Sequence, residues 1–138
     1  MFVTFFLGII DLKTGHTDYC NAGHNHPYLL NEDGTVEEIK GTHGTPLGIF
    51  EDIDYKSDHL VLKKHDSIVM YTDGITEAMD KNDELFTDQR LTDFLAPYPG
   101  KSPKLITRDL LNEVKAFAED AVQSDDITIL SLTYYLEK

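Results

Sequence analysis

An apolar run that stops at an acid and a glycine constrains this chain more than any other feature. Residues 68–71 read Ile-Val-Met-Tyr, and Thr72, Asp73 and Gly74 follow. A continuous apolar run rich in β-branched and aromatic residues is typical of a buried strand. Asp73 therefore lies at the end of a predicted strand, beside a glycine that allows a sharp turn. An acid in this place either caps the next segment or binds a ligand.

A second acidic position occurs near the end of the chain. Asp125 and Asp126 directly precede an apolar segment that is predicted to form a strand over residues 127–136. Acids at the mouths of two buried strands suggest a divalent-metal site, because hard ions such as Mg²⁺ take carboxylate oxygens and waters. In the alternative interpretation, Asp73 only starts a turn and the later pair only caps the last strand. The spacing alone leaves both interpretations open.

Composition narrows the class of protein. The 138 residues fit one domain, and 41% of them are hydrophobic, which is enough for a core. The chain carries 12 basic and 25 acidic residues, a formal net charge of -13. This balance argues against nucleic acid and anionic membranes as partners, since both favour clustered Lys and Arg. The lone cysteine, Cys20, cannot form an internal disulfide, so we expect a cytoplasmic protein.

The periodicity predicts a mixed α/β (α+β) chain whose first half is all strand. The predicted strands cover residues 1–11, 16–21, 28–30, 36–39, 60–62 and 68–71.

The second half is predicted to be helical until its end. One helix is predicted over residues 87–95, and the prolines and glycine after it stop it. Ser102 and Pro103 offer an N-cap and a first-turn residue for a second, amphipathic helix over residues 103–119.

Four ordered motifs resemble those of one known family. Residues 71–78, YTDGITEA, resemble the YTDGxTEA motif of the SpoIIE-like branch of the metal-dependent (PPM-type) protein serine/threonine phosphatases. Residues 21–27, NAGHNHP, resemble its NAGHNPP loop, with His26 in place of the first proline. Residues 44–48, GTPLG, resemble its GxPLG loop, and residues 124–128, SDDIT, its closing DDIT motif. Together they span nearly the whole chain, so the resemblance is specific.

The resemblance implies a fold and a site. The fold is a β-sandwich of two packed sheets flanked by helices, with a two-metal centre at one edge that holds Mn²⁺ or Mg²⁺. By this resemblance, Asp73 and Asp125 are the metal-binding, catalytic residues. Asp126 takes the place of Asp125 if the register differs by one residue.

This sequence also departs from the family pattern. The family's opening strands carry GDxxD-type and DVxGxG motifs, and nothing here matches them. The chain is therefore expected to be one partial domain, residues 1–138, that corresponds to the C-terminal two-thirds of the family's domain. Its metal centre should be incomplete. A sandwich without its opening strands exposes unpaired backbone and apolar surface, so we expect self-association into a homo-oligomer or marginal stability.

The implied activity is hydrolysis of phosphoserine or phosphothreonine on a regulatory protein. In bacterial sigma-factor partner switching, the family's substrates are commonly anti-sigma-factor antagonists, and no phosphoenzyme is formed. The alternative is a catalytically incomplete, phosphatase-like binding module. The missing ligands favour the alternative, whereas the retained Asp73 and Asp125 favour the enzyme.

A few other residues have both a chemical and a structural interpretation. His24 and His26 could bind zinc, but a role in hydrogen bonding within the loop is favoured. Glu77 could orient a water on the metal or help cap the turn after Asp73. Arg90 and Arg108 are the only arginines and lie in predicted helices, so metals would meet most of the phosphate charge.

Overall fold

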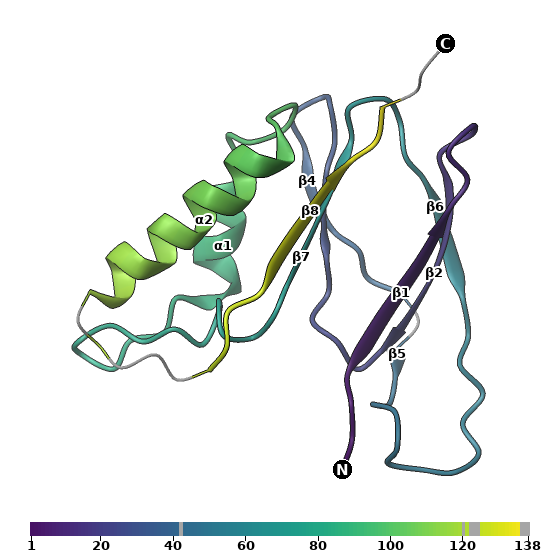
Figure 1. Cartoon of the computed structure of the whole chain (residues 1–138), viewed down its shortest axis with the longest axis horizontal. Helices are drawn as coiled ribbons and strands as arrows, with labels where there is room; N and C mark the ends of the chain where they lie inside the picture. The colour runs from purple at the N-terminus through teal and green to yellow at the C-terminus, as the bar shows by residue number, and fades with distance from the viewer. Residues whose placement is uncertain (42, 120, 122–124, 136–138) are drawn as a thin grey trace.

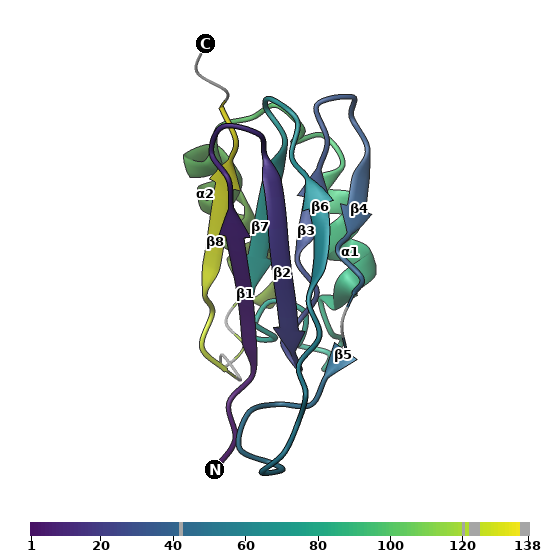
Figure 2. The ribbon, with the colours of Figure 1, turned by 90° about the vertical axis from the view of Figure 1, so that its right-hand side faces the viewer.

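The chain folds into three layers, a pair of helices and two β-sheets (Figure 1). The computed structural model describes residues 1–41, 43–119, 121 and 125–135. Both helices cover the outer face of one sheet, and the second sheet packs on its other face (Figures 1 and 2). The two packed sheets with flanking helices confirm the predicted sandwich, with the helices on one side of it. No helix among these residues is both long and apolar enough to cross a membrane.

The first sheet is built around β2. Its strands are β1 (Phe5–Ile10), β2 (His16–Ala22), β5 (His43–Gly44) and β6 (Asp58–Val61). Strand β1 runs antiparallel to β2 along its whole length. On the other side of β2, β6 pairs antiparallel with its first half and β5 pairs parallel with its end.

The second sheet carries the predicted buried strand at its centre. Its order is β4 (Val36–Glu38), β3 (Tyr28–Leu30), β7 (Ser67–Tyr71) and β8 (Ile129–Thr133). All three pairings are antiparallel. Strand β7 is buried along nearly its whole length, which explains its unbroken apolar run. Strand β8 lies within the predicted range 127–136, of which residue 136 falls outside the described residues.

The two helices follow the predicted boundaries closely. Helix α1 covers Thr87–Leu95 and helix α2 covers Pro103–Ala118. The Ser102 hydroxyl accepts a hydrogen bond from the Leu105 amide, and Pro103 occupies the first turn, as predicted. The buried residues of α2, Ile106, Leu110 and Val114, recur at helical spacing and face the sheet.

Each interface between layers has its own apolar core. Between the helices and the second sheet, Val69 and Tyr71 of β7 pack against helical residues such as Leu91 and Leu110. Between the sheets, Ile68 of β7 packs with Tyr19 of β2. Strand β7 therefore contributes alternate side chains to both cores.

The side of the sandwich that carries β1 and β8 is open. Within the described residues each of these strands has a single strand neighbour, and both views place them on the same side (Figures 1 and 2). Leu130 and Leu132 lie opposite Met70 and Ile68, so they face the space between the sheets, yet they are 50% and 36% exposed. This side presents apolar surface and unpaired backbone.

Strand β1 differs from its prediction. An almost unbroken apolar strand from residue 1 suggests a core strand, but β1 begins at Phe5 and lies at the edge of its sheet. Phe6 and Ile10 pack into the core between the sheets, whereas Phe5, Leu7 and Ile9 on the other face are exposed.

Candidate metal centre

The predicted site begins where β7 ends. After Tyr71 the chain makes a tight turn in which the Ile75 amide donates to the Thr72 carbonyl (3.0 Å) and the Glu77 amide to the Asp73 carbonyl (2.8 Å). Helix α1 starts only at Thr87, so Glu77 lies in a turn and not in a helix. The Asp73 side chain is exposed.

Thr72 joins this turn to the segment before β8. Its amide donates to the Thr128 carbonyl (3.1 Å), and its hydroxyl donates to the Asp126 carbonyl (2.8 Å). The same hydroxyl accepts a hydrogen bond from the Thr128 amide (2.9 Å). These three bonds extend the β7–β8 pairing past the end of the ladder. They hold the two acidic motifs side by side, although α1 and α2 separate them in the chain.

Gly74 allows the two segments to approach this closely. It is buried, and a Cβ atom at this position would lie 2.5 Å from the Asp126 carbonyl oxygen and 3.2 Å from that of Asp125. No side chain fits between the turn and residues 125–126 at those distances. The glycine after Asp73 is therefore required by backbone packing.

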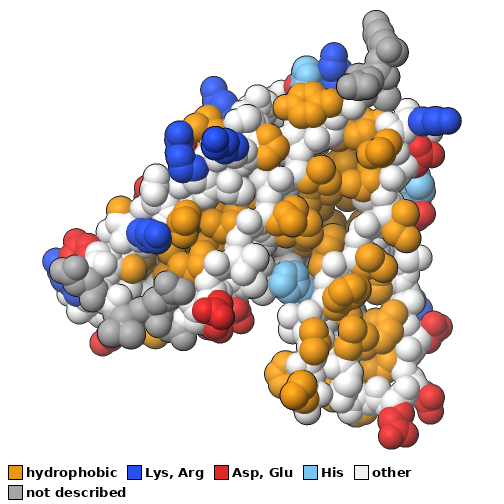
Figure 3. Space-filling view, viewed as in Figure 1, with side chains coloured by type: hydrophobic (Ala, Val, Ile, Leu, Met, Phe, Trp, Pro, Cys, Tyr) orange, Lys and Arg blue, Asp and Glu red, His pale blue; other side chains and the backbone are white. Residues whose placement is uncertain are grey.

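The two predicted ligands project from these joined segments as exposed carboxylates. Asp125 and Asp126 are both exposed, and Asp125 Oδ1 accepts a hydrogen bond from the Asp126 amide (2.7 Å). Figure 3 shows acidic side chains gathered near the lower end of β8. Ser124, the first residue of that motif, falls outside the described residues. The structure brings the segments of Asp73 and Asp125 together, and their roles as ligands stay predictions.

The donor chemistry suits a hard divalent ion. Mg²⁺ and Mn²⁺ are bound by one or two carboxylates with several waters, which matches two exposed acids at a rigid turn. Among the described residues, however, no group of three His, Cys, Asp or Glu side chains is placed to hold a metal ion. The described residues therefore do not by themselves form a site with three such ligands.

A polar cavity lies beside the end of β7. Its volume is about 400 Å³, and its lining residues are Gly23, His24, Asn25, His26, Glu38, Tyr71 and Asp88. The Tyr71 hydroxyl donates to Asp88 Oδ1 (3.0 Å), and burial, followed by the nearby Tyr28 and Asp88, raises the Tyr71 pKa strongly. His26 Nδ1 lies 2.7 Å from Glu38 Oε1. No sequence pattern predicts this cavity, because the loop after β2 meets β4, β7 and α1 only in the fold.

The two histidines of the loop have different surroundings. His24 is half-buried, and burial lowers its pKa, while the negative charge of Asp73 acts in the opposite direction. Its Nδ1 lies 3.2 Å from the Thr4 hydroxyl, whereas His26 pairs with Glu38. The hydrogen-bonding role expected of His24 is thus present, and its ring also lies in the electrostatic field of Asp73.

Both arginines are engaged within the helical layer. The Arg90 guanidinium lies over the Phe117 ring, 4.8 Å from its centroid, and the Arg108 Nε–H donates to Asp109 (2.8 Å). These contacts agree with the expectation that arginine is not available to the site.

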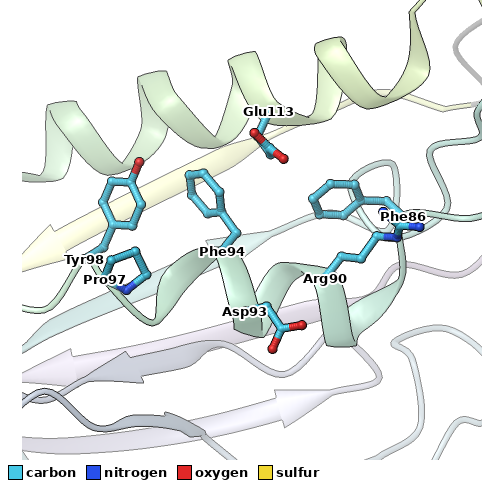
Figure 4. Close-up of a pocket in the computed structure, with 7 residues that line it drawn as sticks. All are labelled: Phe86, Arg90, Asp93, Phe94, Pro97, Tyr98 and Glu113. Atoms are coloured by element: carbon cyan, nitrogen blue, oxygen red, sulfur yellow. The ribbon is translucent and has the colours of Figure 1, made fainter.

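A second cavity of about 400 Å³ lies between the helices (Figure 4). Phe94 points from α1 toward α2, which carries Glu113, and the Phe94 ring stacks on Tyr98 at 4.7 Å. Its lining, as described, includes neither Asp73 nor Asp125. The volume of a cavity alone therefore does not locate the predicted site.

Comparison with known proteins identifies the family. The model of the family described as Stage II sporulation protein E (SpoIIE) matches residues 1–135. This chain belongs to the SpoIIE family. Membership confirms the resemblance that the four motifs predict.

Two curated relatives of this SpoIIE-family chain are bacterial. It is 33% identical to Protein IcfG from Synechocystis sp. over 135 residues, which is 96% of this chain and 20% of that protein. It is 35% identical to Phosphoserine phosphatase RsbU from Bacillus subtilis over 83 residues, which is 59% of this chain and 24% of that protein. The chain therefore spans a fifth to a quarter of the length of these relatives.

A solved structure shares the fold over nearly the whole chain. The crystal structure of the RsbU and RsbW domains of Rv1364c from Mycobacterium tuberculosis is similar with a TM-score of 0.76 and 26% identity. The match covers 98% of this SpoIIE-family chain and 37% of that chain.

Proposed function

We propose that this chain is part of a metal-dependent protein serine/threonine phosphatase that acts in sigma-factor partner switching. Its substrate is a phosphoserine or phosphothreonine on a regulatory protein such as an anti-sigma-factor antagonist. The supporting relative RsbU is named a phosphoserine phosphatase, and the similar structure from M. tuberculosis contains RsbU and RsbW domains. The protein acts in the cytoplasm.

The observation that carries this proposal is the hydrogen-bonded junction at Thr72. It fixes the Asp73 turn against residues 125–126 in a chain that the SpoIIE family model matches almost throughout. In the proposed site, Asp73 and Asp125 bind Mn²⁺ or Mg²⁺.

In this proposal the chain's own residues bind the ion and hold its ligands in place, and the ion supplies the reactive chemistry. When bound, such an ion lowers the pKa of water and neutralises phosphoryl charge. Thr72 and Gly74 set the spacing between the two carboxylate-bearing segments. Since both arginines are engaged in the helices, the phosphoryl charge falls mainly to the metal.

The second candidate function is a phosphatase-like docking module without catalysis. The observation that favours it is the absence, among the described residues, of any group of three metal-ligating side chains. In that case the exposed acids would contact a regulator instead of an ion. The two candidates differ in one measurable respect, which is whether phosphate release depends on Asp73.

The deciding experiment is an assay of phosphate release from a phosphoserine peptide with and without Mn²⁺. The variants are Asp73→Asn and Asp125→Asn, with Asp93→Asn as the control. Asp93 is also exposed, but it lies on α1 and accepts a hydrogen bond from Gln89. We expect Mn²⁺-dependent release that falls by about 100-fold or more in the two site variants, because even an indirect metal partner is worth 10 to 100-fold. Equal release by all variants would exclude this site, and no release by any would support the docking module.

A further inference from the structure

The cleft between the two helices has an aromatic wall. Phe94 and Tyr98 both line this cavity of about 400 Å³, and their rings stack with 4.7 Å between centroids. Both side chains are half-buried, so each ring keeps part of its surface open to the cleft. Phe94 points from α1 toward α2, and Glu113 of α2 lines the same cavity (Figure 4). The cleft thus combines open aromatic surface with a carboxylate.

The aromatic wall is held in place before any ligand arrives. The Tyr98 hydroxyl donates to Asp109 Oδ2 (3.1 Å), and the Tyr98 amide donates to the Leu95 carbonyl (2.9 Å). Phe86, which also lines the cleft, is only 2% exposed and contacts the Phe117 ring edge-on at 5.3 Å. A ligand therefore meets rings that are already ordered, which lowers the entropic cost of binding.

The charges in the cleft favour a cation. Asp93 and Glu113 line it, and neither takes part in an ion pair among the described residues. Arg90 also lines the cleft, but its guanidinium lies over the Phe117 ring at 4.8 Å and 3.9 Å from Glu84 Oε2. The lining therefore holds two carboxylates and one cation that has partners of its own.

We propose that this cleft is a docking site for an arginine side chain of a partner protein. The guanidinium stacks on the wall of Phe94 and Tyr98 and pairs with the Glu113 carboxylate. Arginine fits both contacts, because its planar group stacks on aromatic faces and forms forked hydrogen bonds with carboxylates, whereas lysine is a compact, strongly hydrated charge. The net charge of -13 also favours the approach of a basic partner. This inference goes beyond the proposed function and does not rest on it.

The test is an NMR titration of the isotope-labelled whole chain with capped arginine, acetyl-arginine methylamide, at constant ionic strength. The probe is raised through the tens-of-millimolar range, because a single side chain binds weakly. We expect amide shifts that are confined to α1 and α2 around the cleft. The same compound with citrulline in place of arginine keeps the planar shape without the charge, and it should bind about 3-fold more weakly or less tightly still.

Three variants locate the binding. We expect Glu113→Gln and Phe94→Leu each to weaken binding of capped arginine by about 2 to 5-fold. Glu37→Gln is the matched control, since it removes the same charge from an exposed position on β4 and should bind as tightly as the unchanged chain. Glu113 is itself exposed, so Glu113→Gln tests the cleft without disturbing the core, and circular dichroism verifies that each variant is folded.

Loss of binding in Glu113→Gln and Phe94→Leu, with Glu37→Gln unchanged, supports the docking site. If Glu37→Gln weakens binding as much as Glu113→Gln, the probe follows only the overall negative charge and the inference is wrong. Equal binding of the citrulline compound, or of capped lysine, would overturn the choice of arginine. Absence of shifts around the cleft would overturn the site itself.

Discussion

Replacing Gly74 by alanine tests the central contact of the candidate site. The added Cβ would lie 2.5 Å from the Asp126 carbonyl oxygen, whereas ordinary contact begins at 3.4 Å. The turn or the segment before β8 must therefore move by roughly 0.9 Å, which is overpacking against backbone and not against a flexible side chain. Such a shift also stretches the hydrogen bond from the Thr72 hydroxyl to the Asp126 carbonyl, now 2.8 Å, beyond bonding distance.

The expected cost combines both effects. Overpacking a well-packed site costs about 1–3 kcal/mol, and each lost hydrogen bond about 0.5–1.5 kcal/mol. We therefore expect Gly74→Ala to lower the free energy of unfolding by about 3 kcal/mol. The measurement is urea unfolding followed by circular dichroism, in which the midpoint should fall while the slope stays constant.

Gly8→Ala is the matched control. A Cβ atom at Gly8 would meet only side-chain carbons, at 3.8 Å on Phe6 and 3.9 Å on Thr17, which is ordinary contact. A compatible Gly→Ala change alters stability by only about 0.4–1 kcal/mol, and in the stabilising direction. If Gly74→Ala unfolds within about 0.5 kcal/mol of Gly8→Ala, the turn and residues 125–126 are not packed together as described.

Two further predictions concern other parts of the fold. Burial acts to raise the pKa of Glu38, but the hydrogen bonds and charges of His26 and Lys40 together outweigh burial and lower this pKa. A group whose pKa is lowered on folding contributes stability that is present at neutral pH and is lost as the pH falls through that pKa. We therefore expect Glu38→Gln to be less stable than the unchanged chain by under about 1 kcal/mol at neutral pH, and equally stable in acid. A loss of stability that persists in acid would contradict this prediction. Ile9 is 66% exposed on the edge strand β1, so Ile9→Lys should reduce self-association in light scattering without lowering the unfolding midpoint appreciably. A monomeric unchanged chain with a sharp unfolding transition would show that the open side does not drive association.

The sequence predicts well those elements whose signals are local. Helix α2 begins where Ser102 and Pro103 predict, because a cap and a first-turn proline act within one turn of chain. Strand β7 is also predicted correctly, since burial on both faces leaves an unbroken apolar run. In both cases the residues that determine the element are neighbours in the chain.

The parts of the fold and of the candidate site that the sequence does not predict depend on contacts between segments that are distant in the chain. The apolar residues of β1 on both faces suggest a core strand, and only the sheet order shows that Phe5, Leu7 and Ile9 lie uncovered. Strand β5 spans two residues, too few for any periodicity. The Asp73 turn carries a recognisable motif, but its junction with residues 125–128 follows from how β7 and β8 pair, which no local pattern records.

The junction at Thr72 also has a consequence for the order of folding. Strands β7 and β8 pair across both helices, so their contact has high sequence separation and carries a large loop-closure cost. The segments that carry Asp73 and Asp125 therefore come together only in the step that docks β8. A partly folded chain that has formed its hairpins and helices still lacks this junction. An ion that needs both carboxylates would bind only after this step, and by binding only the completed state it would stabilise the docked β8.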